Sequence, residues 1–217
     1  MSRGVLVVEG HGETRAALNL VTRLWSDLGL SPQPWDDPPV RGLALHTRQG
    51  LERAAELVRR KVDVSGLLIL RDEDDACPRN TGPLASGWIA SLHLPFPAAL
   101  VLLHREYESL FLPCLHRMAG RPLTDPRGVE REGLRADARF DGDPQGPRDA
   151  KGEVSARFAA GSYKPTLDQL ALTRMIEFGD IRASGLPAFG TLERALRFLA
   201  GGHPPGTVYP AAAPGGA

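Results

Sequence analysis

Apolar and polar residues recur along the first half of the chain with two periods, one typical of strands and one typical of helices. Short apolar runs, as in buried strands, alternate with longer stretches in which apolar residues recur at spacings of three and four. The runs predict strands at residues 5–8, 40–45, 67–70 and 98–103. The longer stretches predict helices at residues 14–28, 51–62, 80–92 and 107–118.

Strands separated by helices of this length indicate crossover connections between parallel strands. The run at 67–70 is apolar at every position, as in a strand that is covered on both faces. We therefore expect an α/β fold over residues 1–119, with a Rossmann-like, mainly parallel central sheet flanked by helices.

The second half of the chain follows a different pattern. Residues 120–150 are rich in Pro, Gly, Arg and Asp, which indicates a long insertion loop with a short helix at 129–134. Helical patterns return at 149–159, 166–178 and 192–200, so residues 120–200 are expected to form an insertion and a C-terminal helical lobe packed on the core. The last segment, GGHPPGTVYPAAAPGGA at 201–217, offers few residues to bury and predicts a disordered tail.

Composition excludes several classes of protein. The 217 residues include 26 basic and 26 acidic side chains, and 42% are hydrophobic, which is too apolar for a disordered chain. A formal charge of zero gives no support for a broad basic surface of the kind that binds nucleic acid non-specifically, although it leaves room for a local basic groove. No apolar run approaches the roughly 18 residues of a membrane span, and the N-terminus lacks the features of a signal peptide. We expect a cytoplasmic protein with no membrane partner.

A run of four acidic residues follows the apolar strand at 67–70. In an extended chain alternate residues share a side, so Asp72 and Asp74 are expected to point together and Glu73 to point away. Two converging carboxylates repel each other, and a divalent cation with oxygen ligands relieves that repulsion. The alternative is a solvated acidic loop, or a helix cap before Pro78.

Glu9 follows the other central strand in the sequence Glu9-Gly10-His11-Gly12-Glu13. Gly10 and Gly12 permit a sharp turn and a close approach of the backbone to a ligand, and the start of the next helix can receive an anion. Glu9 is a candidate general acid or base, or a further metal ligand. Glu13 is also a candidate ligand, with a favourable interaction with the helix dipole as its alternative role.

The chain resembles the Toprim fold, in which a strand ends in Glu-Gly and a later strand ends in Asp-x-Asp. More closely it resembles the Toprim-related family called domain of unknown function 4276, related to the overcoming-lysogenization-defect nucleases. The resemblance covers most of residues 5–199 and rests on five stretches. These stretches are VVEGHGE at 7–13, LRDED at 70–74, REYESLF at 105–111, YKPTLDQ at 163–169 and PAFGTL at 187–192.

The resemblance implies roles for several of these residues. Glu9 would be the catalytic acid or base, and Asp72 and Asp74 would hold Mg²⁺ or Mn²⁺. Either Glu106 or Glu108 would face the same site; we take Glu106 as the metal-ligand candidate. Two lysines are candidates for phosphate contacts; Lys164 is the substrate-binding candidate, and a solvated helix face is expected for Lys151.

Two functions follow as expectations. The first is a metal-dependent phosphodiesterase or nuclease acting on nucleic acid, with water as the nucleophile because no tyrosine has an identifiable strand-transfer setting. The resemblance places such proteins in bacterial anti-phage or mobile-element conflict, sometimes beside an ATPase. The alternative is a non-catalytic module that binds metal or nucleotide and regulates a partner ATPase. The three carboxylates Glu9, Asp72 and Asp74 favour the enzyme, because charged groups that are held together and desolvated are costly.

Overall fold

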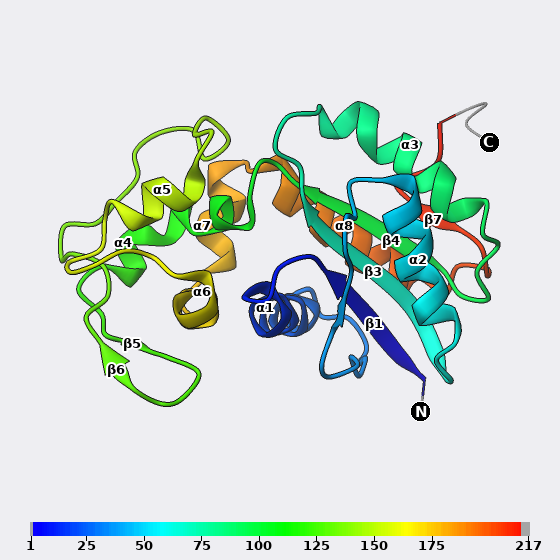
Figure 1. Cartoon of the computed structure of the whole chain (residues 1–217), viewed down its shortest axis with the longest axis horizontal. Coiled ribbons are helices and arrows are strands. Elements are labelled where there is room, and N and C mark those ends of the chain that lie inside the picture. The colour runs from blue at the N-terminus through cyan, green and yellow to red at the C-terminus, as the bar shows by residue number, and fades with distance from the viewer. Residues whose placement is uncertain (1, 214–217) are drawn as a thin grey trace.

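The computed structural model describes residues 2–213, which form a parallel sheet with helices on both faces and a lobe beside it (Figure 1). The strand order is β2-β1-β3-β4-β7, and every neighbouring pair is parallel. The strands are β1 (Arg3–Val8), β2 (Val40–Arg41), β3 (Val64–Asp72), β4 (Ala98–Leu103) and β7 (Val208–Tyr209). The expected α/β fold with a parallel, helix-flanked sheet is confirmed, and its arrangement is consistent with a Rossmann-like fold.

The central strands bury side chains on both faces of the sheet. Along β1, Leu6 and Val8 face one hydrophobic cluster while Val5 and Val7 face the other. Helices α1 (Glu13–Asp27) and α8 (Pro187–Ala200) contribute to the first cluster, and α2 (Arg48–Arg59) and α3 (Pro78–Ala90) to the second. Successive residues of a strand point to opposite faces, so a strand covered on both sides is apolar throughout.

The lobe lies beside the α1 end of the sheet and shares its hydrophobic core (Figure 1). Arg23 of α1 ties the two parts together, because its guanidinium donates to the carbonyl oxygens of Thr173 (2.8 Å) and Ile176 (2.6 Å). The elements of the lobe are η1 (Tyr107–Leu110), η2 (Leu112–Cys114), α4 (Leu115–Met118), β5 (Leu123–Thr124), β6 (Glu130–Arg131), α5 (Ala150–Ser155), α6 (Pro165–Arg174) and α7 (Phe178–Ser184).

Two of the helices that the sequence predicts, one in the core and one in the insertion, are wrong. The segment 107–118 is broken into η1, η2 and α4, because Pro113 has no N–H to continue one helix. The predicted helix at 129–134 is instead the antiparallel hairpin of β5 and β6. Asp125 sets its turn by accepting hydrogen bonds from the backbone N–H groups of Arg127 (2.8 Å) and Val129 (2.9 Å).

Other boundaries move by several residues. The strand expected at 40–45 ends at Arg41, and the following backbone turns away through Ala44, whose φ is 53°. The helices expected at 149–159 and 166–178 are the shorter α5 and α6, and residues 178–184 form the separate helix α7.

The C-terminal segment is ordered where the sequence predicts disorder. Strand β7 pairs with β4 at Ala98 and Ala99, and the Tyr209 ring lies 5.8 Å from that of Phe198. An edge position in a sheet supplies backbone partners to a segment whose own composition is poor in apolar residues. Helix α8, which the prediction assigned to the lobe, covers the sheet. Residues 214–217 of the predicted tail lie outside the described residues.

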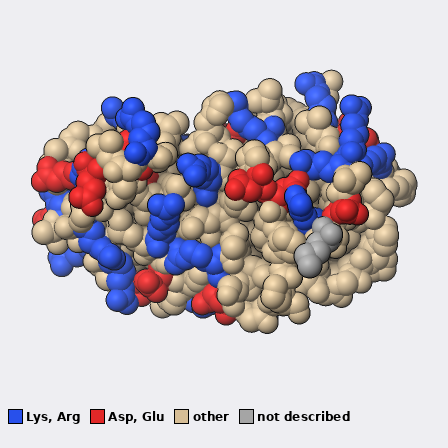
Figure 2. Space-filling model, turned by 90° about the horizontal axis from the view of Figure 1, so that it is seen from below, with Lys and Arg blue, Asp and Glu red and all other residues tan. Residues whose placement is uncertain are grey.

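Charged side chains are distributed unevenly over the surface. On the face seen in Figure 2, Lys and Arg side chains form a broken band from the lobe end to the middle of the molecule. A neutral chain therefore still presents a locally basic surface. Within residues 2–213, no helix combines the length and the apolar composition needed to cross a lipid bilayer.

Candidate functional site

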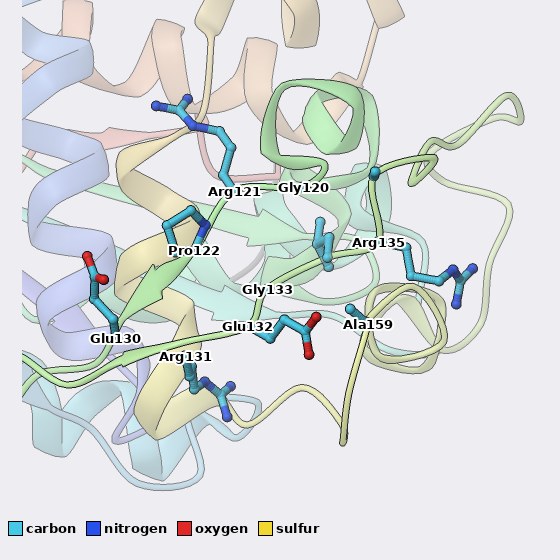
Figure 3. A pocket seen from close by; sticks show the side chains of 11 residues that line it. Gly120, Arg121, Pro122, Glu130, Arg131, Glu132, Gly133, Arg135 and Ala159 are labelled. Carbon is cyan, nitrogen blue, oxygen red and sulfur yellow. The ribbon is translucent and has the colours of Figure 1, made fainter.

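A pocket of about 510 Å³ lies in the lobe beside the β5–β6 hairpin (Figure 3). Its charged side chains point in different directions rather than toward one position. Arg131 pairs with the buried Asp168 and lies over the ring of Phe158, and Arg135 donates to the carbonyl oxygen of Ala156 at 2.6 Å. Because these groups are occupied by structural contacts, this pocket is a weak candidate for chemistry.

The carboxyl edge of the parallel sheet is the stronger candidate. Strands β1, β3 and β4 are adjacent and parallel, so the residues that follow them reach the same edge. Ligand sites in open α/β sheets form at this edge. Glu9 follows β1, Asp72 ends β3 and Glu106 lies just beyond β4. The topology therefore brings the three predicted segments together.

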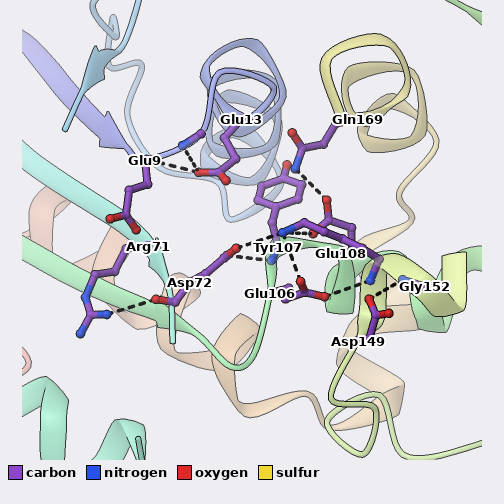
Figure 4. A network of polar contacts seen from close by, with 12 residues as sticks. Glu9, Glu13, Arg71, Asp72, Glu106, Tyr107, Glu108, Asp149, Gly152 and Gln169 are labelled. Carbon is purple, nitrogen blue, oxygen red and sulfur yellow. Dashed lines mark hydrogen bonds and ion pairs between the residues drawn. The ribbon is translucent and has the colours of Figure 1, made fainter. Parts of the chain in front are cut away.

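The predicted set of Glu9, Asp72 and Asp74 does not form one ligand group. Within residues 2–213, no group of three or more His, Cys, Asp or Glu residues is arranged to hold a metal ion. Glu9 points toward another loop, where its Oε1 accepts the backbone N–H of Leu45 at 2.8 Å. Figure 4 shows the carboxylates of Glu9 and Asp72 directed to different sides.

Asp74 lies apart because β3 ends at Asp72 and the strand alternation stops there. The Asp74 side chain is exposed, and the structure shows no side-chain partner for it among residues 2–213. Glu73 is the buried acid of this segment, and its Oε2 lies 2.6 Å from Nη2 of the buried Arg71. The expectation that Glu73 points away from Asp72 agrees with this pairing. The expectation that Asp72 and Asp74 point together into one site does not agree with the structure.

The turn after β1 is stabilised by contacts within the protein. Glu13 accepts hydrogen bonds from the backbone N–H groups of Gly10 (3.1 Å) and Glu9 (3.3 Å), so its carboxylate holds the turn that precedes its own helix. A Cβ atom on Gly12 would lie 2.8 Å from the backbone of Pro165. Gly12 is thus required for the close approach of α6. The sequence analysis had instead explained this glycine by the close approach of a ligand.

Three carboxylates surround one ammonium group at the sheet edge, and we call Asp72, Glu106, Glu108 and Lys151 the carboxylate cluster. Lys151 Nζ lies 3.1 Å from Glu106 Oε1, 3.8 Å from Asp72 Oδ2 and 3.9 Å from Glu108 Oε2. Backbone groups also hold the cluster, since Tyr107 N–H donates to Asp72 (2.8 Å) and Lys151 N–H donates to Glu106 (2.9 Å). Figure 4 shows this network between β3, η1 and the start of α5.

Glu108 is the most buried member of the cluster, with none of its surface exposed. Its Oε1 accepts hydrogen bonds from the Tyr163 hydroxyl (2.8 Å) and the Gln169 amide (3.3 Å). Its Oε2 is buried without a hydrogen-bond partner among the described residues. This oxygen faces the Lys151 ammonium at 3.9 Å, which is beyond hydrogen-bond distance.

Burial and crowding shift the proton affinities of the cluster. Burial raises the pKa of Asp72 well above its usual value, and the nearby charges of Glu13 and Glu108 raise it further. Burial also raises the pKa of Glu108 to about 7. Burial alone would lower the pKa of Lys151, but attraction from Glu108, Asp72 and Glu106 raises it overall. The raised pKa values favour the protonated, neutral forms of Asp72 and Glu108, so protons relieve part of the repulsion among the three carboxylates.

Sequence reasoning missed the pairing of this cluster with Lys151, which it had placed on a solvated helix face. Glu106 and Glu108 both face the site, whereas the prediction chose only Glu106. The signal available was the acidic pair of Glu106 and Glu108 directly after a buried strand, which parallels Asp72 and Asp74. Lys164 is exposed, and no side-chain contact of Lys164 is present within residues 2–213.

The cluster has the donor chemistry of a divalent-cation site, although its side chains as placed among residues 2–213 are not arranged to hold an ion. Carboxylate oxygens are the ligands that Mg²⁺ prefers, and the buried Glu108 Oε2 accepts no hydrogen bond from the described residues. Asp72, Glu106 and Glu108 are the residues that would hold the ion. Lys151 already supplies one positive charge there, so the ammonium must move for an ion to bind.

Comparisons with family models, with curated proteins and with solved structures found no match to this chain.

Proposed function

We propose that the protein is a Mg²⁺- or Mn²⁺-dependent phosphodiesterase that acts on nucleic acid. The observation that carries the proposal is the carboxylate cluster at the carboxyl edge of the sheet, where three carboxylates surround one ammonium and a buried Glu108 oxygen accepts no hydrogen bond. Desolvated acidic groups are costly to stability and are typical of functional sites. The Toprim resemblance stated for the sequence supports the same reaction.

Each group of the site has a distinct role in this proposal. A bound divalent cation supplies charge stabilisation to the phosphate that is attacked. Asp72, Glu106 and Glu108 would hold the cation, and Lys151 would turn from the cluster to a phosphate oxygen. For Glu9 to take the proton of the attacking water, its partly exposed carboxylate must turn from the Leu45 N–H toward the cluster. Lys164, at the start of α6, is exposed and available for a further phosphate contact.

The surface supports a nucleic-acid substrate. The band of basic side chains in Figure 2 provides positive charge on a protein whose net charge is zero. Attraction between such side chains and backbone phosphates is sequence-independent and weakens with salt. Binding through this band is therefore expected to fall steeply as the salt concentration rises.

One observation favours the second candidate, a non-catalytic module that regulates a partner such as an ATPase. Lys151 already occupies the cluster, and Glu9 and Asp74 lie outside it. In that case the ion-pair cluster joins α5 of the lobe to β3 of the sheet and performs no chemistry.

The test is cleavage of labelled single- and double-stranded DNA and RNA by the purified protein with Mg²⁺, Mn²⁺ or EDTA. We expect metal-dependent cleavage by the wild type and a loss of at least about 100-fold in Glu106→Gln, which removes a ligand charge. Glu130→Gln, on the exposed hairpin strand β6, is the matched control and should keep full activity.

The setting that the resemblance suggests is bacterial defence, so a phage-challenge assay in the native operon covers an activity that needs a partner. Protection by the wild type that persists in both Glu106→Gln and Asp72→Asn contradicts the catalytic proposal and supports the regulatory module.

A further inference from the structure

A second pocket lies at the carboxyl end of β4 and shares no residue with the carboxylate cluster. It has a volume of about 360 Å³ and is bounded by the start of α3, the start of α8 and β7. The segment after β7 forms one wall, since Ala213 N–H donates to the carbonyl oxygen of Pro83 at 3.3 Å. Pockets of this size take small organic molecules.

The floor of the pocket is apolar. Leu100 and Leu102 of β4 form it and are 1% and 5% exposed, respectively. Pro83 of α3 and Pro210 after β7 extend the apolar wall. A flat or apolar part of a ligand would lose contact with water on this floor, which favours an organic molecule over a simple ion.

The rim of the pocket is positively charged. Arg79, Arg194 and His104 line it, and none of the described residues that line it is Asp or Glu. The guanidinium of Arg194 is positioned by two neutral groups, because Nε donates to the Tyr209 hydroxyl (2.9 Å) and Nη2 donates to the Thr191 hydroxyl (3.1 Å). Within residues 2–213, neither arginine forms an ion pair with a carboxylate. Two arginines without acidic partners beside one pocket are typical of an anion site.

Two further features add to the positive potential. Helices α3 and α8 both begin at this pocket with a proline, and neither has a side-chain cap on its first N–H groups. Helix N-termini attract anions. His104 also lines the pocket, and its Nδ1–H group donates to the carbonyl oxygen of Glu73 at 2.9 Å. The other ring nitrogen, Nε2, takes no part in this hydrogen bond.

We propose that this pocket binds a phosphate ester of about mononucleotide size, with its phosphate between Arg79 and Arg194 and its organic part on the Leu100–Leu102 floor. This site is separate from the carboxylate cluster, and its binding does not require a divalent cation. One hydrogen bond joins their surroundings, from His104 of the pocket to the carbonyl oxygen of Glu73, the residue after Asp72 of the cluster.

The experiment is calorimetric titration of the full chain in EDTA with AMP, adenosine and inorganic phosphate as probes. We expect AMP to bind with a dissociation constant below about 1 mM, and adenosine and phosphate to bind at least about tenfold more weakly, because each offers only part of the contact. Arg194→Gln and Arg79→Gln should each weaken AMP binding by about tenfold or more.

Arg197→Gln is the matched control, because Arg197 is an exposed arginine of α8 that does not line the pocket. Its affinity for AMP should equal that of the wild type. Absence of AMP binding at millimolar concentration overturns the proposal. Equal affinity in Arg194→Gln and Arg197→Gln also overturns it, since it would place the nucleotide elsewhere. Because the titration contains no metal and measures no cleavage, its result is independent of the proposed phosphodiesterase activity.

Discussion

Glu108 shows how one fully buried side chain affects the whole site. It combines a hydrogen bond from Tyr163, a nearby ammonium and an orphaned oxygen, and its pKa is raised to about 7 by burial. The folded protein thus binds a proton at Glu108 more tightly than the unfolded chain does. That difference makes the stability of the fold depend on pH.

The first prediction concerns this pH dependence in the metal-free protein. Between pH 4.5, the ordinary pKa of the group, and about pH 7, the native state holds more protons at Glu108 than the unfolded state. Stability from this group is therefore present below pH 4.5 and is lost as the pH rises toward 7, by at most about 1.4 kcal/mol for each pH unit.

Urea unfolding of Glu108→Gln across pH 4.5–7 in EDTA checks the prediction. The variant should show a flatter dependence on pH than the wild type, and Glu130→Gln should behave as the wild type does. A pH dependence in Glu108→Gln as steep as that of the wild type would falsify the assignment.

The second prediction concerns Lys151, the ammonium at the centre of the cluster. Lys151→Met keeps most of the side-chain length and removes the charge, so three carboxylates repel one another without compensation. We expect a loss of about 1–2 kcal/mol at neutral pH, below the loss for a fully buried pair because the Lys151 side chain is 42% exposed.

Added Mg²⁺ should restore more stability to this variant than it adds to the wild type. Thermal unfolding with and without Mg²⁺ measures both effects; a variant as stable as the wild type in EDTA would show that the cluster does not depend on Lys151.

At the scale of elements, the contact between the start of α1 and the start of α6 positions the lobe. Gly12 permits this contact, because any side chain there meets the backbone of Pro165. Arg23 holds the other end of α6 through the carbonyl oxygen of Thr173. Gln169 on the same helix then reaches Glu108. The two helices together fix the distance between the lobe and the sheet edge.

The third prediction follows from that contact. Gly12→Ala should destabilise the protein by about 1–3 kcal/mol, since α6 must shift to admit the Cβ atom. Gly179→Ala in α7 is the control, because its Cβ would meet nothing within 4 Å, and it should be neutral or slightly stabilising. Chemical denaturation compares the two variants. Equal stabilities would mean that α6 moves freely away from α1.

At the scale of the whole molecule, a parallel sheet brings the ends of three strands to one edge, and the lobe closes over that edge. The cluster takes Asp72 from the sheet and Lys151 from the lobe, so a ligand of the cluster stabilises the joint between the two parts. Anything that binds only the folded state raises the apparent stability by mass action.

The fourth prediction tests the location of the metal site in this way. At a concentration about 100 times its dissociation constant, Mn²⁺ or Mg²⁺ should raise the melting temperature by about 5 °C or more. Asp72→Asn combined with Glu106→Gln should abolish the rise, whereas Asp74→Asn should retain it, because Asp74 lies outside the cluster. Differential scanning calorimetry with each metal is the measurement. A rise that is lost in Asp74→Asn would return Asp74 to the site, as the sequence predicts, and a rise that is kept in the double variant would place the ion outside the cluster.

The sequence by itself determined the α/β class, the central strands and the edge at which acidic residues gather. These features can be predicted because apolar runs and helical periodicity involve residues that are close together in the sequence. The pattern also placed Glu9, Asp72 and Glu106 at strand ends, where the topology brings their segments together.

Only the tertiary structure decided which side chains meet. Lys151 reaches Asp72 although the two residues lie 79 positions apart in the sequence, a contact that no local pattern encodes. Strand β7 is ordered because β4 offers it an open edge, although its own composition predicts disorder. Asp74 leaves the site because β3 ends two residues earlier, at Asp72. Packing and backbone pairing between residues that are far apart in the chain determine these three features, so the local sequence pattern does not predict them.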